Sequence, residues 1–217
     1  MPVEESRVNG RGTGDHEIPE VATLSQVLDL VWSKLNLGAE PKSSDYHVAS
    51  IATIDPNGWP SVRSVVLRKA LRSQNLVVFH TDSRAPKFQH IQSNNRVGWL
   101  FYSRRDKIQI RLQTSAVVHL GDALAHQTFD TMPARCQRVY MAPEAPGALS
   151  ETPTGNLPPG MEDRTPSPDE ARICRSVFAV VDCHIESIDW LYLASTGHRR
   201  AVYCWDGKQF AGSWAAP

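Results

Sequence analysis

Cationic and hydroxyl side chains bracket short apolar runs between residues 63 and 87. Arg63 and Arg68 stand at the ends of one run, and Lys87 follows the next. The complete set is Arg63, Val65, Val66, Leu67, Arg68, His80, Thr81, Arg84 and Lys87. Arginine, lysine and hydroxyl groups bind phosphate, whereas apolar walls and backbone edges hold a ring system. The set therefore indicates an anionic ligand with a flat aromatic part.

Arg63 and Arg68 differ by five positions, so a regular strand places their side chains on opposite faces. One ligand meets both only if the strand twists, bulges or passes along the ligand's edge. Lys87 stands near the expected start of a helix, whose N-terminus favours an anion. Arg84 competes with it as a phosphate contact, and arginines at strand ends can also be ordinary surface charges.

Two further groups of residues suit the ring of such a ligand. Gln109 and Arg111 alternate with apolar residues, and their polar face is either solvated or turned toward a ligand or partner subunit. Gln109 suits a ring carbonyl and Arg111 a negative charge. Nearer the C-terminus, Trp190, His198 and Arg200 combine an aromatic wall, an imidazole and a guanidinium. A cation such as Arg200 stabilises charge that develops on a ring during reduction.

Several classes of protein lack support in the sequence. There is no glycine-rich nucleotide loop and no serine nucleophile elbow, and the eight histidines show no metal-ligand spacing. The four cysteines form no Cys-x-x-Cys pair, which predicts reduced thiols. Basic and acidic residues balance at 23 each, so neither nucleic acid nor a membrane surface is an expected partner. No transmembrane run or signal peptide stands out, and we expect a cytoplasmic protein.

The elements that must position these residues are mostly strands. We expect a disordered tail over residues 1–19 and a single domain over 20–217. A capping box at Thr23 and Gln26 predicts a helix that ends at Gly38. Alternation and turn signals predict strands at 46–54, 61–68, 75–81, 96–103, 107–120, 176–188, 201–205 and 208–214, with helices at 84–93, 121–131 and 133–140. The proline-rich segment 142–169 is expected to be an irregular loop that covers the ligand site or a dimer edge.

Taken in order, these pieces resemble the pyridoxamine 5'-phosphate oxidase-like family. Residues 63–68 resemble its Arg-x-Val-Leu-Leu-Lys strand. His80-Thr81 matches the aromatic-Thr end of the family's next strand, and Lys87 matches the lysine of its Ser-Arg-Lys segment. Gln109 matches the glutamine of its Arg-Gln-Val strand. Near the C-terminus, Trp190 and Arg200 match a Trp and an Arg ten residues apart, and His198 matches the histidine of Arg-Leu-His. The segments 79–84 and 197–201 are similar to a branch of the family distinct from the true oxidase.

The resemblance implies a mainly β protein with flanking helices, a six-stranded antiparallel split barrel that forms a homodimer with FMN at the subunit interface. By resemblance, the phosphate contacts are Arg63, Thr81, Lys87 and Arg84; the ring contacts are Val65, Val66, Leu67, Gln109, Trp190 and Arg200; Arg68, His80 and Arg111 complete the FMN site, and His198 touches the substrate. The implied activity is that of an FMN-dependent oxidoreductase acting on a small molecule.

The sequence also departs from the family pattern. Arg68 replaces the usual lysine, Ala85 and Pro86 replace the serine and arginine before Lys87, and Thr196 stands where the true oxidase has a substrate-binding arginine. These changes favour FMN binding over oxidation of pyridoxamine 5'-phosphate. Two alternatives stay open, a true pyridoxamine or pyridoxine 5'-phosphate oxidase and a flavin- or ligand-binding protein without turnover. No catalytic acid or base is identified.

Overall fold

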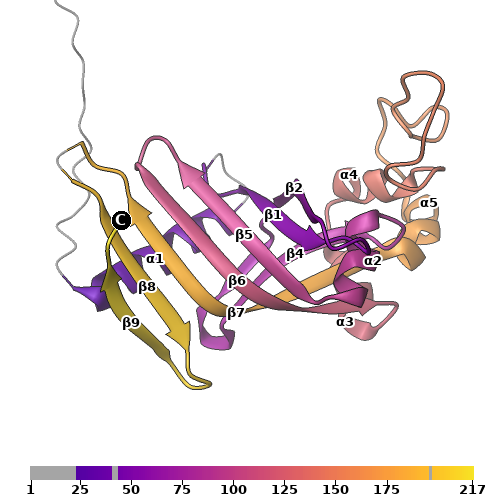
Figure 1. Cartoon of the computed structure of the whole chain (residues 1–217). Coiled ribbons are helices and arrows are strands. Elements are labelled where there is room, and N and C mark those ends of the chain that lie inside the picture. The colour runs from indigo at the N-terminus through magenta and orange to yellow at the C-terminus, as the bar shows by residue number, and fades with distance from the viewer. Residues whose placement is uncertain (1–22, 41–43, 196) are drawn as a thin grey trace, which may run out of the picture.

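Nine strands form one antiparallel sheet in the computed structural model, which describes residues 23–40, 44–195 and 197–217 (Figure 1). The expected tail over residues 1–19 lies outside these ranges. The strands are β1 (Val48–Ile54), β2 (Pro60–Val66), β3 (Lys69–Leu71), β4 (Leu76–Asp82), β5 (Arg96–Ser103), β6 (Ile108–Leu120), β7 (Phe178–Tyr192), β8 (Arg199–Trp205) and β9 (Phe210–Ala215). The predicted class, mainly β with a few helices, is confirmed.

The sheet curves into a barrel that stays open along one seam. Its strand order is β2-β1-β5-β6-β7-β4-β3, with β8 on β7 and β9 on β8, so β2 and β3 are the two ends. At the seam Leu67 N donates to His47 O at 2.9 Å, and Arg68 N donates to Val78 O at 2.8 Å. The chain therefore crosses the seam between Leu67, which is bonded to the residue before β1, and Arg68, which is bonded to β4.

This crossing corrects one sequence prediction. A single strand over residues 61–68 is wrong, because β2 ends at Val66 and β3 begins at Lys69. The predicted antiparallel split barrel is confirmed, and the whole sheet formed by the described residues has nine strands, including β3 and the hairpin β8–β9. The crossing also changes the relation between Arg63 and Arg68. They do not belong to one regular strand, so the rule that positions five apart face opposite sides does not apply to them.

Helix α1 (Leu24–Ala39) begins as predicted and ends differently. Gln26 N donates to Thr23 Oγ1 at 3.2 Å and Thr23 N donates to Gln26 Oε1 at 3.0 Å, which is a complete capping box. Gly38 does not stop the helix, which continues to Ala39. A Cβ at Gly38 would lie 2.3 Å from the carbonyl oxygen of Tyr46. Glycine is required here by a close backbone approach rather than by a turn.

The other helices are short and divide into two groups. They are η1 (Arg72–Gln74), α2 (Pro86–Ser93), α3 (Ala123–Thr131), α4 (Ala134–Gln137), η2 (Arg138–Met141), α5 (Pro168–Ile173) and η3 (Cys174–Val177). Figure 1 shows α3, α4 and α5 gathered at one end of the sheet and the hairpin β8–β9 at the other. None of the helices described is long and apolar enough to cross a membrane.

Two hydrophobic clusters lie on opposite faces of β4. The larger fills the barrel and includes Trp32 of α1, Phe79 and Trp99. The smaller joins Val78 and Phe178 to the helical layer formed by residues 123–177. Because side chains alternate along a strand, β4 carries one cluster on each face. This double burial fixes the position of the polar residues at the strand's end.

The proline-rich segment is tied at both ends by arginines. Arg84 Nη1 donates to the carbonyl oxygen of Ala142 at 3.0 Å. Arg138 Nη1 donates to the carbonyl oxygen of Glu162 at 2.9 Å. No helix or strand occurs between residues 142 and 167, and α5 begins at Pro168, within the predicted loop. The loop rises beyond the helical layer in Figure 1.

Candidate functional site

Two cations, Arg63 of β2 and Lys87 of α2, lie close together beside the seam of the barrel. Arg63 Nη1 donates to Thr53 Oγ1 at 2.6 Å, and Lys87 Nζ donates to Thr81 Oγ1 at 3.2 Å. Burial lowers the pKa of both groups, and the positive charge of Arg63 lowers the pKa of Lys87 further. Within the described ranges neither cation forms an ion pair with a carboxylate. The two charges repel each other and suit a shared anion.

The start of α2 adds to this positive potential. Pro86 occupies its first turn, and the preceding Ala85 has no side chain that could accept a hydrogen bond from the first N–H groups. No acidic residue stands in the first turn. The dipole of such an uncapped helix start favours an anion. Lys87 therefore stands at a point of positive potential.

Three supporting residues escaped the sequence analysis. Thr53 is fully buried, and its Oγ1 lies 3.0 Å from Nδ1 of His90 while it accepts from Arg63. Ser61 Oγ accepts a second hydrogen bond from Arg63. Ser61 could have been found, because it lies two residues from Arg63 on the same strand face. Thr53 and His90 could not, because they belong to β1 and α2 and meet Arg63 only in the folded chain.

A small pocket of about 220 Å³ opens beside these cations. Its lining residues are Val48, Ser64, Val65, Val66, Arg68, His80 and Lys87. Both ring nitrogens of His80 are buried without a hydrogen-bond partner among the described residues, and the ring packs edge-on against Phe178, with 5.0 Å between ring centroids. Burial, with help from Arg68 and Lys69, lowers the pKa of His80 to about 3, so the imidazole is neutral at pH 7. Orphaned buried nitrogens beside a pocket suit a polar ligand group.

Arg84 is engaged elsewhere. Its guanidinium pairs with Asp82, at 2.7 Å between Nη2 and Oδ2, and it reaches the loop carbonyl of Ala142. Arg63, Thr81 and Lys87 thus come together as the sequence predicts. The structure does not place Arg84 with them.

The predicted ring contacts divide between the two faces of the sheet. Val65 is 8% exposed and Leu67 fully buried, both within the barrel core, while Val66 is partly exposed and lines the pocket. Gln109 is partly exposed on β6, in register with Leu191. Arg111 lies two residues further along the same face.

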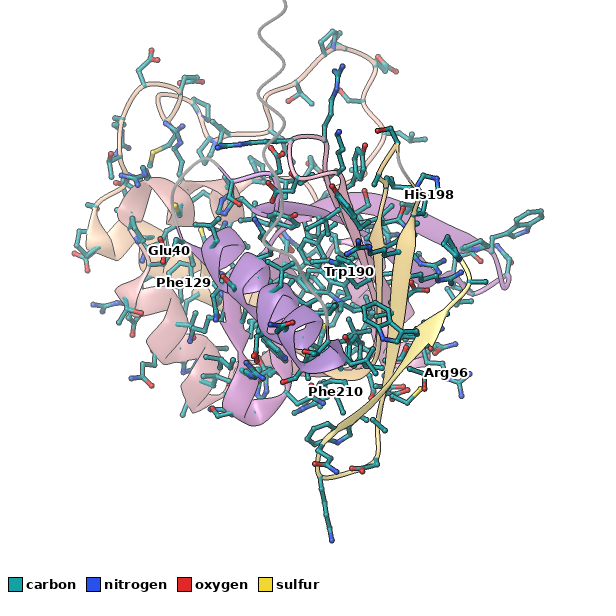
Figure 2. The ribbon with its side chains drawn as sticks, turned by 90° about the vertical axis from the view of Figure 1, so that its left-hand side faces the viewer. Glu40, Arg96, Phe129, Trp190, His198 and Phe210 are labelled. Carbon is teal, nitrogen blue, oxygen red and sulfur yellow. The ribbon has the colours of Figure 1, made fainter. Side chains whose placement is uncertain are left out.

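Trp190 and His198 lie in different surroundings, Trp190 inside the barrel and His198 on the surface. Trp190 is 1% exposed within the barrel core, stacked near Tyr192 at 6.3 Å. His198 is exposed just before β8. Figure 2 shows Trp190 among the inner side chains and His198 at the rim of the molecule. Trp190 and Arg200 therefore do not share a surface in this chain.

An open groove of about 540 Å³ runs across the outer face of the sheet. Among its lining residues are Ala52, Val62, Gly98, Leu100, Arg111, Asp189 and Val202. The groove and the small pocket share the outer faces of β1 and β2, where Val48 and Ser64 line the pocket and Val62 lines the groove. A ligand held by Lys87 therefore has a flat and largely apolar surface next to it.

Residues 30–120 match the family model described as pyridoxamine 5'-phosphate oxidase, FMN-binding domain. This segment is therefore similar to the FMN-binding domain of the pyridoxamine 5'-phosphate oxidase family. The matched segment contains Arg63, Thr81, Lys87 and Gln109, together with every residue that lines the small pocket.

Curated relatives named pyridoxine/pyridoxamine 5'-phosphate oxidase support the same assignment. The chain is 31% identical over 106 residues to the protein of Rhodopseudomonas palustris, which covers 49% of this chain and 47% of that relative. It is 29% identical over 103 residues to the protein of Bradyrhizobium diazoefficiens, covering 48% and 47% respectively. The chain thus matches these relatives over about half of their length.

Solved structures show the same fold. A pyridoxamine 5'-phosphate oxidase-related, FMN-binding protein from Nostoc punctiforme superposes with a TM-score of 0.70 at 18% identity, over 87% of this chain and 96% of that one. PhzG from Burkholderia lata, in complex with tetrahydrophenazine-1-carboxylic acid, gives a TM-score of 0.63 at 15% identity, over 88% and 92%. At such identities the likeness concerns the fold alone.

Proposed function

We propose that this chain binds FMN and acts as an FMN-dependent oxidoreductase on a small molecule. The observation that carries the proposal is the adjacent pair Arg63 and Lys87 at the uncapped start of α2, neither of which forms an ion pair among the described residues. The FMN phosphate carries up to two negative charges, which both cations and the positive end of the helix would stabilise together. The family match supports the same cofactor.

The pocket residues fit the rest of such a cofactor. His80 offers two buried, unpartnered ring nitrogens to the polar groups of the ligand. Val66 supplies an apolar edge, and Arg68 adds a third cation beside His80. When bound, FMN supplies hydride and electron transfer. The residues of this chain hold the phosphate, orient the ring and exclude water from one side of it.

The proposed assembly is a homodimer with FMN at the interface. The outer sheet face exposes Val62 by 65%, Tyr102 by 50% and Leu100 by 39%. Exposed apolar side chains in one patch mark interaction surfaces. Covering this face with a second copy of the chain would also close the groove that adjoins the pocket.

The visible absorption spectrum of the protein, purified and mixed with FMN, tests the proposal. We expect the two-band spectrum of bound flavin to remain after desalting. This spectrum should be lost in the double variant Arg63→Gln/Lys87→Gln. It should be retained in the control Arg72→Gln, because Arg72 is exposed, pairs with Asp29 and does not line the pocket. A colourless wild-type protein would overturn the proposal. Reoxidation of the reduced flavin with turnover of a substrate then separates an enzyme from a binding protein, and pyridoxamine 5'-phosphate is the first substrate to try.

A further inference from the structure

Asp189 of β7 lies between two arginines on the outer face of the sheet. Arg200 of β8 donates to it twice, from Nε to Oδ1 at 3.1 Å and from Nη2 to Oδ2 at 2.6 Å. Arg111 of β6, directly opposite Asp189 in the strand register, pairs with Oδ2 from its other side. We call Arg111, Asp189 and Arg200 the outer-face triad. Three adjacent strands hold these side chains in one place.

The triad carries one net positive charge. Burial alone would raise the pKa of Asp189, but the hydrogen bonds from Arg200 and Arg111 outweigh it and keep the pKa below its usual value. Asp189 is therefore ionised at neutral pH. Its side chain is 18% exposed, against 30% for Arg200 and 50% for Arg111, so the carboxylate is the most sheltered member.

The triad borders the open groove. Arg111 and Asp189 both line it, beside Gly98 and Val202. Gly98 has no side chain, and only Ala52 lies within 4 Å of where its Cβ would stand, so the groove is open at this position. The charge of the triad thus acts on whatever flat group lies in this groove.

We propose that Asp189 is a positioning residue that fixes Arg200 and Arg111 and lowers the reduction potential of the bound flavin. The inference rests on the proposed function, in which FMN lies at the interface that covers this groove, beside Arg111 and Asp189. Reduction of FMN by two electrons and one proton leaves a negative charge on the ring, which nearby cations stabilise. A carboxylate between the two arginines weakens that stabilisation, so the oxidised form is favoured more than it would be beside two free arginines.

Reduction potentials of FMN-loaded variants, measured against a reference dye, test the inference. Asp189→Asn removes the negative charge and should raise the potential, whereas Arg111→Gln removes a positive charge and should lower it. Asp130→Asn provides the control, because Asp130 pairs with Arg175 in the helical layer, away from the groove. Its potential should equal that of the wild type. A structural disturbance alone does not produce shifts of opposite sign.

The conservative variant Asp189→Glu keeps the charge and guards against a folding defect. It should restore both FMN binding and a potential close to the wild-type value if Asp189→Asn impairs either. Shifts of the same sign in Asp189→Asn and Arg111→Gln, or no shift in either, would overturn the inference while leaving FMN binding intact. Failure of the wild-type protein to bind FMN would instead overturn the proposed function.

Discussion

The surroundings of His80 lower the pKa of its imidazole well below its usual value. Its ring packs against Phe178, close to the cations Arg68 and Lys69, and none of the described residues forms a hydrogen bond with its nitrogens. A protonated imidazole there would be both desolvated and repelled. The folded chain therefore keeps His80 neutral until the pH falls to about 3.

This environment predicts that the folded protein loses stability at acidic pH, and that His80→Phe removes this part of the loss. In the unfolded chain the imidazole takes up a proton below its ordinary pKa of 6.5, but the folded protein does not until about pH 3. The unfolded state thus binds more protons in this window, and stability is lost as the pH falls from 6.5 toward 3. The expected loss from this group at pH 5 is about 2 kcal/mol.

Urea unfolding of the FMN-free protein at pH 7 and pH 5 measures this loss. The midpoint of His80→Phe should fall less than that of the wild type between the two values. The exposed His198 provides the matched control, and His198→Phe should follow the wild type. Parallel pH dependences in the wild type and His80→Phe would contradict the account.

At the residue scale, the sequence could predict which residue types bind phosphate but not which of them are available. Arg63, Thr81 and Lys87 come together as predicted. Arg84 does not lie with them, because its guanidinium forms an ion pair with Asp82, two residues earlier in the chain. The Asp-x-Arg spacing was visible in the sequence, whereas the position of Ala142, which fixes the rest of that side chain, was not.

At the scale of elements, local chemistry set the start of α1, whereas a tertiary contact explains the glycine at position 38. The capping box is a pattern within four residues and was predictable. The role of Gly38 was not, because it depends on the approach of Tyr46 from the following strand connection. The end of β2 at Val66 had the same origin, since it depends on the contacts of Leu67 with His47 and of Arg68 with Val78 in the folded chain.

Gly38→Ala should destabilise the protein although alanine favours helices. Alanine improves helix propensity by about 1 kcal/mol over glycine. Its Cβ, however, would lie 2.3 Å from the backbone oxygen and 2.7 Å from the backbone carbon of Tyr46, so the backbone must move. Overpacking of this kind costs about 1–3 kcal/mol, so we expect a net loss and a lower melting temperature.

Calorimetry of Gly38→Ala and Gly155→Ala separates the contact from the substitution itself. A Cβ at Gly155 would meet no atom within 4 Å, and the residue has no positive φ, so its replacement should leave the melting temperature unchanged. A melting temperature of Gly38→Ala equal to or above the wild-type value would show that α1 and Tyr46 do not approach each other as described.

At the scale of the whole molecule, alternation and turn residues predicted an antiparallel, mainly β fold. They could not predict the order β2-β1-β5-β6-β7-β4-β3, because pairing between distant strands leaves no local pattern. They also left open whether the polar row of β6 faces solvent or a ligand. The structure shows that Arg111 borders a groove that continues toward the pocket, on the face that we propose as the dimer interface.

The dimer proposal predicts that one lysine on this face separates the subunits. Val62 is 65% exposed, so Val62→Lys should leave the isolated chain folded while burying a charge in the interface. We expect a monomer in light scattering at micromolar concentration and weaker FMN binding. Val139→Lys alters a residue that is 61% exposed on the helical layer and should remain a dimer. If Val62→Lys and Val139→Lys show the same molecular mass in light scattering, the proposed interface is contradicted.

The central claim is that Arg63 and Lys87 form a phosphate site for FMN, and a comparison of FMN with riboflavin tests it most directly. Riboflavin has the same ring but no phosphate. Fluorescence titration should show much tighter binding of FMN to the wild type, with a loss of about tenfold to a hundredfold in Lys87→Gln and no change for riboflavin. Equal affinities of the wild-type protein for FMN and riboflavin would contradict the account.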